Sequence, residues 1–109
     1  MTAKLFLIIV GFINAQEQAS FEHYKTEINK HYEAAGATVT DRYPVLQVLA
    51  GEEKPDFVMV VEFPNAEALQ SVFASPEYQK LVPYREKGFK KLNVFLSNKN
   101  DVETQKARN

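Results

Sequence analysis

The sequence contains no cysteine, and this absence excludes several kinds of chemistry. Without thiols the chain has no disulfide, no thiolate metal site and no cysteine nucleophile. The lack of cysteine is compatible with a reducing cytoplasm, and we expect the protein to be cytoplasmic. Charge imbalance is also missing, because 13 basic and 14 acidic residues leave a net charge of −1. A strong electrostatic attraction to nucleic acid or to an anionic membrane is therefore not expected.

Membrane-spanning segments and the common catalytic motifs are absent as well. The apolar segment at residues 5–10 is too short to cross a bilayer. It also lacks a small-residue cleavage pattern, so we interpret it as a strand and not as a signal peptide. The sequence has no glycine-rich phosphate loop, no nucleophile elbow and no Ser-His-acid order. We therefore predict no cofactor.

The sequence has only two histidines, and they do not predict a metal site. His23 and His31 are expected on one helix with Glu27 between them. They are two helical turns apart, which is too far for both to bind one metal ion. With no further cluster of ligands in the chain, a solvated helix face explains them better.

At 109 residues, the chain is expected to form one domain with one hydrophobic core. We place this domain at residues 1–97. Residues 98–109 are polar and have no apolar periodicity, so we predict a frayed tail there. The alternative is a tail that reaches across to a partner subunit.

The chain is organised around residues 57–63, with the sequence FVMVVEF. Its β-branched and aromatic residues, bounded by prolines on both sides, predict a strand. Neither of its two faces is polar over its whole length, so we expect both faces to be covered. Residues 5–12 have the same character and predict a second strand that is buried on both faces.

Two helical regions are expected between the strands. The first runs from a loose capping box at Asn14 and Glu17 to about residue 35, and Gly36 ends it. The second begins at Asn65, which has the side chain of an N-cap, and restarts at Ser75 before a proline. Pro83 is expected to kink or break this second region. Gly88 is expected to end it.

Two further strands complete the pattern. Residues 38–49 predict a long strand, and Pro44 predicts that it is an edge strand or has a bulge at that position. Residues 50–55 are expected to be the hairpin connection, and residues 90–97 the last strand. The fold class is therefore α+β, with a ferredoxin-like βαββαβ order and a four-stranded antiparallel sheet. Right-handed crossovers place the first and third strands, which are the most apolar, in its centre.

This topology leaves one apolar face of the sheet without a cover. Both helical regions lie on the same face, and strands of this length and spacing give the other face roughly 400 Å². Such an area is comparable to the largest apolar patch of a typical monomer, roughly 300–600 Å². We therefore predict a homodimer in which two sheets face each other as a dimeric α+β barrel.

One stretch of the chain resembles a known family. The segment EFPNAEALQSVFASPEYQKLVPYR, preceded by QVLAGEEKPDFVMVV, is similar to the domain of unknown function 1330 family. The similarity covers roughly residues 6–96, and its most specific part is the Phe63-Pro64 turn followed by residues 75–79 and Arg85. Family members often have paired glycines after the first helix and in the second strand, where this chain has Ala35-Gly36-Ala37 and Arg42-Tyr43-Pro44. The resemblance implies a ferredoxin-like dimeric barrel, and it implies no catalytic residue.

Four side chains are the candidates for a ligand site between the sheet and the helices. They are Tyr24 and His31 on the first helix, and Tyr78 and Arg85 on the second helical region. Arginine would orient an anionic or carbonyl oxygen and tyrosine would supply a hydroxyl. His31 would move a proton near neutral pH, so His31 and Arg85 are the catalytic candidates. A structural histidine and core tyrosines are the alternative interpretation.

Arg42 and Arg85 are also candidates for holding a carboxylate in a bidentate fork. The alternative for these two arginines is a salt bridge at the surface or at the dimer edge.

Three classes of function remain open from the sequence. The first is a dimeric barrel that binds a small organic molecule, with or without turnover. Any reaction there would depend on the reactivity of the substrate itself, as in cofactor-independent monooxygenases and isomerases of similar fold. The second is a non-enzymatic stress or assembly protein on the same scaffold. The third, an RNA-binding sheet, is disfavoured by the near-zero charge and the apolar central strands. We expect the first.

Overall fold

The structure, a computed structural model, describes residues 4–98. The predicted tail therefore lies outside the described residues, apart from Asn98. The described elements follow the expected order of strands and helices. They are β1 (Leu5–Ile13), η1 (Ala15–Glu17), α1 (Gln18–Ala34), β2 (Thr38–Pro44), β3 (Phe57–Phe63), α2 (Ala66–Phe73), α3 (Pro76–Gly88) and β4 (Phe89–Ser97).

The four strands form one antiparallel sheet in the order β2-β3-β1-β4. The two most apolar strands, β1 and β3, occupy its centre and pair with each other from Leu5↔Phe63 to Gly11↔Phe57. The predicted α+β, ferredoxin-like topology is confirmed. β2 lies at one edge of the sheet, as its proline predicted.

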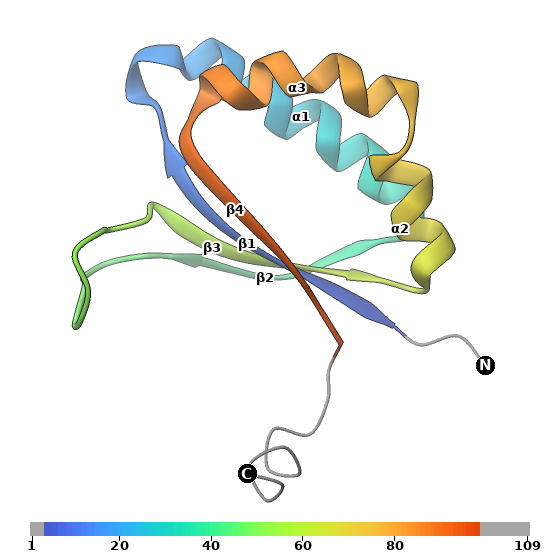
Figure 1. The fold of residues 1–109 in the computed structure, drawn as a ribbon, viewed down its shortest axis with the longest axis horizontal. Coiled ribbons are helices and arrows are strands. Elements are labelled where there is room, and N and C mark those ends of the chain that lie inside the picture. The colour runs from blue at the N-terminus through green and yellow to red at the C-terminus, as the bar shows by residue number, and fades with distance from the viewer. Residues whose placement is uncertain (1–3, 99–109) are drawn as a thin grey trace, which may run out of the picture.

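The three helices lie on one face of the sheet, as Figure 1 shows. The core fills the space between this face and the helices. Alternate residues of the central strands enter it, among them Leu7, Ile9, Val61 and Phe63, and the helices together with Phe89 at the start of β4 contribute the remaining members. From the helices these members are Tyr24, Ile28, Tyr32, Val72, Tyr78 and Leu81.

The start of the first helical region differs from the predicted capping box. The Asn14 side-chain oxygen accepts from the backbone N–H of Gln16, which begins the 3-10 turn η1. Glu17 becomes the residue before α1 and makes no side-chain cap; its carboxylate instead accepts from the Ser20 hydroxyl at 3.3 Å. The box does not form because the extra turn moves the true start of α1 by several residues. The predicted end is confirmed, since Gly36 has a φ of 77°.

The two predicted N-caps of the second helical region are confirmed. The Asn65 side-chain oxygen accepts from the N–H of Ala68 at 2.8 Å. The Ser75 hydroxyl accepts from the N–H of Tyr78 at 3.1 Å and so starts α3. Each cap satisfies one of the backbone donors that a helix leaves unpaired in its first turn.

Pro83 was expected to kink or break the second helical region, and the predicted break is wrong. α3 runs through Pro83 to Gly88. A proline inside a helix removes one backbone hydrogen bond and costs about 3 kcal/mol in isolation. Here both halves of α3 are held by packing, because Leu81 is buried before the proline and Gly88 is buried after it. At Gly88 an added Cβ would lie 2.7 Å from the Cα atom of Phe21.

The second strand is shorter than predicted. β2 ends at Pro44 and not at residue 49, and its register shifts between Val39 and Asp41 and not at the proline. Pro44 has no N–H for the ladder, and beyond it the Val45 N–H donates to the carbonyl of Asp56 at 3.0 Å. The connection therefore spans residues 45–56, and it projects from the body of the molecule in Figure 1.

The face of the sheet opposite the helices is apolar along its middle. Ile8 pairs with Val60 and with Phe95, and Val10 pairs with Val58, so their side chains share this face. Among residues 4–98, no helix lies over it (Figure 1). In that same part of the chain, no helix has the length and apolar character needed to cross a membrane.

Candidate functional site

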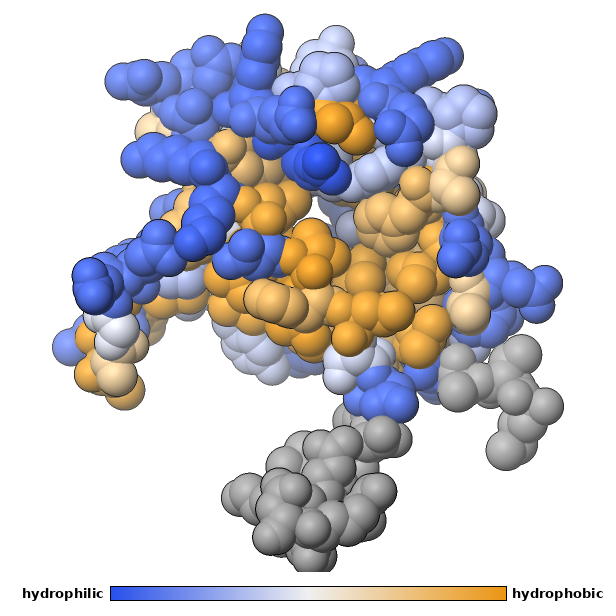
Figure 2. All heavy atoms as spheres, in the orientation of Figure 1, coloured by the Kyte–Doolittle hydropathy of each residue, from blue (hydrophilic) through white to orange (hydrophobic). Residues whose placement is uncertain are grey.

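A cavity of about 410 Å³ lies between the sheet and α1. Its volume is within the range of small-molecule sites, roughly 300–1,000 Å³. Side chains from all four strands and from α1 line it, with Phe73 of α2 closing one end. In Figure 2, apolar atoms gather over the crossing strands below the polar helix layer, and the surface is hollowed between the two.

Seven of the sixteen residues that line the cavity are aromatic. They come from α1, β2, β3, α2 and the start of β4, and they are Phe21, Tyr24, Tyr32, Tyr43, Phe57, Phe73 and Phe89. Phe89 makes edge contacts with Phe21 and Tyr24 at centroid distances of 5.4 and 5.8 Å. Such T-shaped contacts hold the rings in fixed orientations. The cavity is thus an apolar space with a defined shape.

Gly11 determines the position of one of these rings. It pairs with Phe57 in the sheet, and a Cβ added at Gly11 would lie 2.4 Å from the Phe57 ring. The missing side chain lets the ring lie flat across the backbone of β1. Phe57 therefore lines the cavity without filling it.

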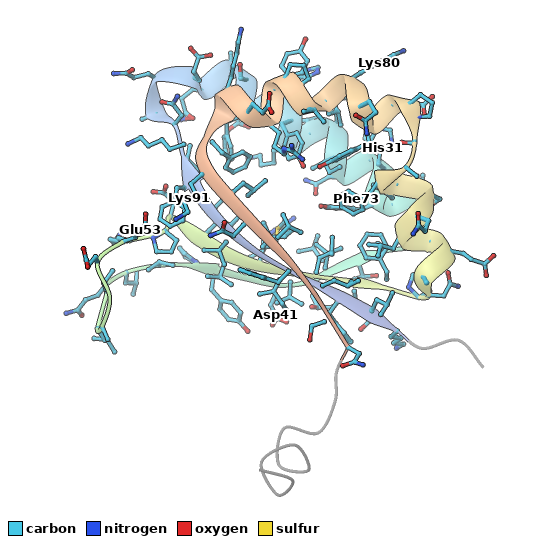
Figure 3. The ribbon with its side chains drawn as sticks, in the orientation of Figure 1. His31, Asp41, Glu53, Phe73, Lys80 and Lys91 are labelled. Carbon is cyan, nitrogen blue, oxygen red and sulfur yellow. The ribbon has the colours of Figure 1, made fainter. Side chains whose placement is uncertain are left out.

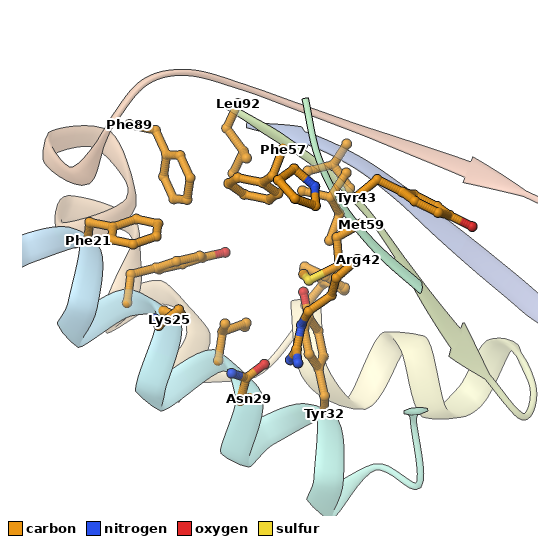
Figure 4. A pocket seen from close by; sticks show the side chains of 16 residues that line it. Phe21, Lys25, Asn29, Tyr32, Arg42, Tyr43, Phe57, Met59, Phe89 and Leu92 are labelled. Carbon is orange, nitrogen blue, oxygen red and sulfur yellow. The ribbon is translucent and has the colours of Figure 1, made fainter. Parts of the chain in front are cut away.

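Three polar side chains, from α1 and β2, also line the cavity. Lys25 and Asn29 are one turn apart on α1, and Arg42 projects from β2 on the opposite side. In Figure 4, the Arg42 guanidinium points toward α1 beside Asn29, and the Tyr32 hydroxyl points into the cavity. The site combines an apolar interior with a few convergent polar groups, which is the usual arrangement of ligand sites.

Tyr24 connects the cavity to a polar group behind it. The Tyr24 and Tyr78 hydroxyls interact, and the Arg85 guanidinium donates to the Tyr78 hydroxyl at 2.8 Å. Three of the four predicted site residues are therefore brought together as a chain of contacts. Of these three, Tyr24 lines the cavity, while Arg85 lines a second pocket beside β4 that shares Phe89, Leu92 and Val94 with the cavity.

The fourth candidate, His31, lies apart from this chain. It is half-buried in the helix layer and lines none of the described pockets (Figure 3). His23 packs against the Tyr84 ring of α3 at a centroid distance of 4.2 Å. Within residues 4–98, no group of three or more acidic or histidine side chains is placed to hold a metal ion.

Burial raises the pKa of the two tyrosines that line the cavity and belong to the core. Desolvation raises the pKa of Tyr24, with a smaller contribution from the neighbouring Tyr32. Desolvation also raises the pKa of Tyr32. Both phenols therefore stay neutral at physiological pH and remain hydrogen-bond donors.

Sequence reasoning missed several residues of the site. Lys25 and Asn29 were not considered, although they follow the apolar face of α1 at helical spacing from Tyr32. That spacing was the available signal. Phe57 and Met59 were assigned only to the core, because a sequence does not show where a core leaves a space. Tyr32 and Tyr43 also line the cavity, beside the predicted site residue Tyr24.

Solved structures with little sequence similarity share this fold. The RPA0582 protein of unknown function from Rhodopseudomonas palustris has a TM-score of 0.81 at 14% identity, over 93% of this chain and 85% of that one. SnoaB, a cofactor-independent oxygenase from Streptomyces nogalater, has a TM-score of 0.63 at 9% identity, over 91% and 95%. A dimeric protein of unknown function with a ferredoxin-like fold from Bacteroides fragilis has 0.56 at 11%, over 87% and 95%.

At these identities, the similarity to solved structures shows the fold alone. No curated protein matches the sequence significantly. The family described as Domain of unknown function (DUF1330) matches residues 6–98, which include every described strand and helix except the first residue of β1. The resemblance seen in the sequence is thereby confirmed, and this chain belongs to the DUF1330 family.

Proposed function

We propose that this protein binds a small organic molecule in the cavity between the sheet and α1. The observation that carries the proposal is the cavity itself, about 410 Å³ within a domain of this size and lined largely by apolar side chains. A protein used only as a scaffold has no need of such a space, because an unfilled core loses the contacts that close packing would provide.

Tyr24 is the predicted site residue that we place against the ligand. Its neutral hydroxyl is positioned to bond a ligand oxygen. Tyr78 and Arg85 act behind it as positioning residues, since the Arg85–Tyr78 bond of 2.8 Å orients the phenol that Tyr24 meets. His31 does not line this cavity, and we give it no role in the proposal.

Any chemistry in this site would use the reactivity of the ligand itself. The similar fold of SnoaB, a cofactor-independent oxygenase, supports this kind of reaction by analogy. A ligand that is itself easily oxidised or deprotonated needs only orientation and exclusion of water from the protein. The apolar wall would exclude water from the ligand, and the tyrosine hydroxyls would orient the ligand.

We further propose that the protein is a homodimer through the open face of its sheet. The apolar residues on that face support this, and so does the dimeric protein of similar fold from Bacteroides fragilis. The cavity lies on the other face, so dimerisation would leave its lining in place. The two surfaces can then be tested independently.

The proposed function can be tested by measuring probe binding to a variant in which a larger side chain fills the cavity. The neutral fluorescent probe 2-naphthalenemethanol should bind the wild-type protein, and Leu92→Trp should weaken binding by about tenfold or more because the larger side chain occupies the cavity. Lys80→Trp, on the exposed surface of α3, is the matched control and should bind as wild type does. Circular dichroism establishes that both variants fold.

Mass spectrometry of small molecules that co-purify with the wild-type protein, and are lost in Leu92→Trp, would identify the natural ligand. If a folded Leu92→Trp variant binds the probe as tightly as wild type, the cavity is not the site. The non-enzymatic assembly function then becomes the better interpretation.

A further inference from the structure

We infer that the ligand of this cavity is an aromatic or similarly apolar molecule with a single carboxylate, held at the cavity mouth by Arg42. This inference rests on the proposed function and specifies its ligand class. It follows from the charges that line the cavity, from the lack of an ion pair or side-chain hydrogen bond to Arg42 among residues 4–98, and from the groups around Arg42.

The charged residues that line the cavity all have the same sign of charge. Its two charged residues, Lys25 and Arg42, are both cationic, and none of its lining residues is acidic. The protein as a whole is nearly neutral, with a net charge of −1. A local excess of positive charge at the edge of an apolar space favours an anionic group at that edge.

Arg42 is the stronger of the two candidates for binding an anion. Among residues 4–98, it makes no ion pair and no side-chain hydrogen bond. The carboxylate of its neighbour Asp41 makes no ion pair with it and instead accepts from the Tyr43 hydroxyl at 2.8 Å. Asp41 pairs with Val60 and Arg42 with Met59, so the two side chains leave opposite faces of the sheet.

Lys25 is a weaker second cation. Its ammonium pairs with Glu22 at 3.2 Å and lies 5.5 Å from the centre of the Phe21 ring. Its charge is therefore partly compensated. This leaves one uncompensated guanidinium at the mouth, which suits a ligand with one negative charge better than a phosphate ester with two.

The geometry of a guanidinium favours a carboxylate in particular. Its planar fork donates two parallel hydrogen bonds to the two carboxylate oxygens. Asn29, beside Arg42 in Figure 4, can donate a third from its side-chain amide. Deeper in the cavity, the Tyr32 hydroxyl offers a neutral donor for an oxygen on the ligand body, since burial keeps its pKa above the usual range.

The apolar body of the ligand would lie among the rings of Phe21, Phe57 and Phe89. Met59 and Leu92 complete this part of the wall. Offset and edge contacts with such rings favour a flat, aromatic ligand. The anion at the mouth and the flat body inside together describe an aromatic carboxylic acid or a compound with the same shape and charge.

An isosteric pair of probes tests the inference. The anion 2-naphthoate and the neutral 2-naphthamide have nearly the same shape and differ in charge. We expect the wild-type protein to bind 2-naphthoate about tenfold more tightly at low ionic strength, and this preference to shrink as salt is added. Titration calorimetry or probe fluorescence with the full chain gives both affinities.

Variants at the mouth assign the preference to Arg42. Arg42→Gln should lower the affinity for 2-naphthoate by about tenfold. The affinity of this variant for 2-naphthamide should stay within about twofold of the wild-type value. Arg42→Lys should recover part of the loss, because it restores the charge without the fork. Lys80→Gln removes an exposed cation far from the cavity and is the matched control (Figure 3).

The outcomes separate this inference from the proposed function. Equal binding of the two probes by wild type, or an Arg42→Gln variant that keeps the preference, would overturn the carboxylate inference and leave the cavity as a site for neutral molecules. Binding of neither probe would overturn both. A preference that disappears in Arg42→Gln but not in Lys80→Gln supports the inference.

Discussion

The two faces of the sheet have similar composition and very different surroundings. On one face, Leu7 and Val61 are buried under the helices, and Val61 is 0% exposed. On the other face, Ile8 and Val60 are only half-buried, and Phe95 is 55% exposed. Neighbouring residues of one strand thus share a sequence pattern but not an environment. The comparison shows that the sequence of an apolar strand predicts that both of its faces are covered. It does not predict which element or partner covers each face.

The largest effect is expected when a charge is placed on the open face. Val60→Asp should dissociate the proposed homodimer at micromolar concentration, because an unpaired carboxylate in an apolar interface costs at least about 3 kcal/mol, or more than a hundredfold in affinity. Sedimentation velocity measures this. Lys80→Asp on α3 is the control and should stay dimeric. A wild-type protein that sediments only as a monomer would show that the open face needs no second copy.

On the side of the sheet that the helices cover, we expect the substitution Gly88→Ala to lower the stability strongly without preventing dimerisation. In Gly88→Ala, the new Cβ would lie 2.7 Å from backbone atoms of Phe21, which cannot move as a side-chain end can. We expect the free energy of unfolding to fall by about 1–3 kcal/mol in denaturant titrations. Glu86→Ala, exposed on the same helix, should change it by less than about 0.5 kcal/mol. Equal values for the two variants would contradict the close approach of α3 and α1.

The matched pair Val61→Ala and Val60→Ala compares the two faces directly. Val61→Ala removes buried methyl groups from the core and should cost about 2 kcal/mol at every protein concentration. Val60→Ala should cost less in dilute protein, and its effect should grow with concentration as the dimer forms. Thermal unfolding at several protein concentrations distinguishes these cases. Two concentration-independent losses of equal size would mean that both faces are covered within one chain.

The smallest expected effect concerns the helix layer alone. Ser75→Ala removes the hydroxyl that accepts from the Tyr78 N–H and should destabilise the monomer by about 1 kcal/mol, with no change in dimer affinity. Ser71→Ala is a suitable control, because its exposed hydroxyl only donates to a carbonyl within α2. Urea unfolding of the two variants side by side checks the prediction. Indistinguishable midpoints would show that the Ser75 cap does not stabilise α3.

Much of the candidate site was beyond prediction from the sequence. Tyr24, Tyr78 and Arg85 were chosen by residue type and helical spacing, and the structure brings these three together. His31 satisfied the same criteria and lies elsewhere in the helix layer (Figure 3). Helical spacing identifies a face of a helix, but it does not identify which element packs against that face. Arg42 illustrates the converse, since only the register of its strand brings it into the cavity lining together with Asn29.

The sequence by itself determined the order of the elements, the central position of β1 and β3, the caps at Asn65 and Ser75 and the end of α1 at Gly36. These depend on local chemistry and alternation, which act over a few residues. Tertiary structure decided the passage of α3 through Pro83, the end of β2 at Pro44 and the cavity beside Arg42. These depend on packing between segments that are distant in the chain. Burial of the rest of α3 offsets the local cost of its proline, and the missing side chain of Gly11 leaves room for the ring that borders the cavity.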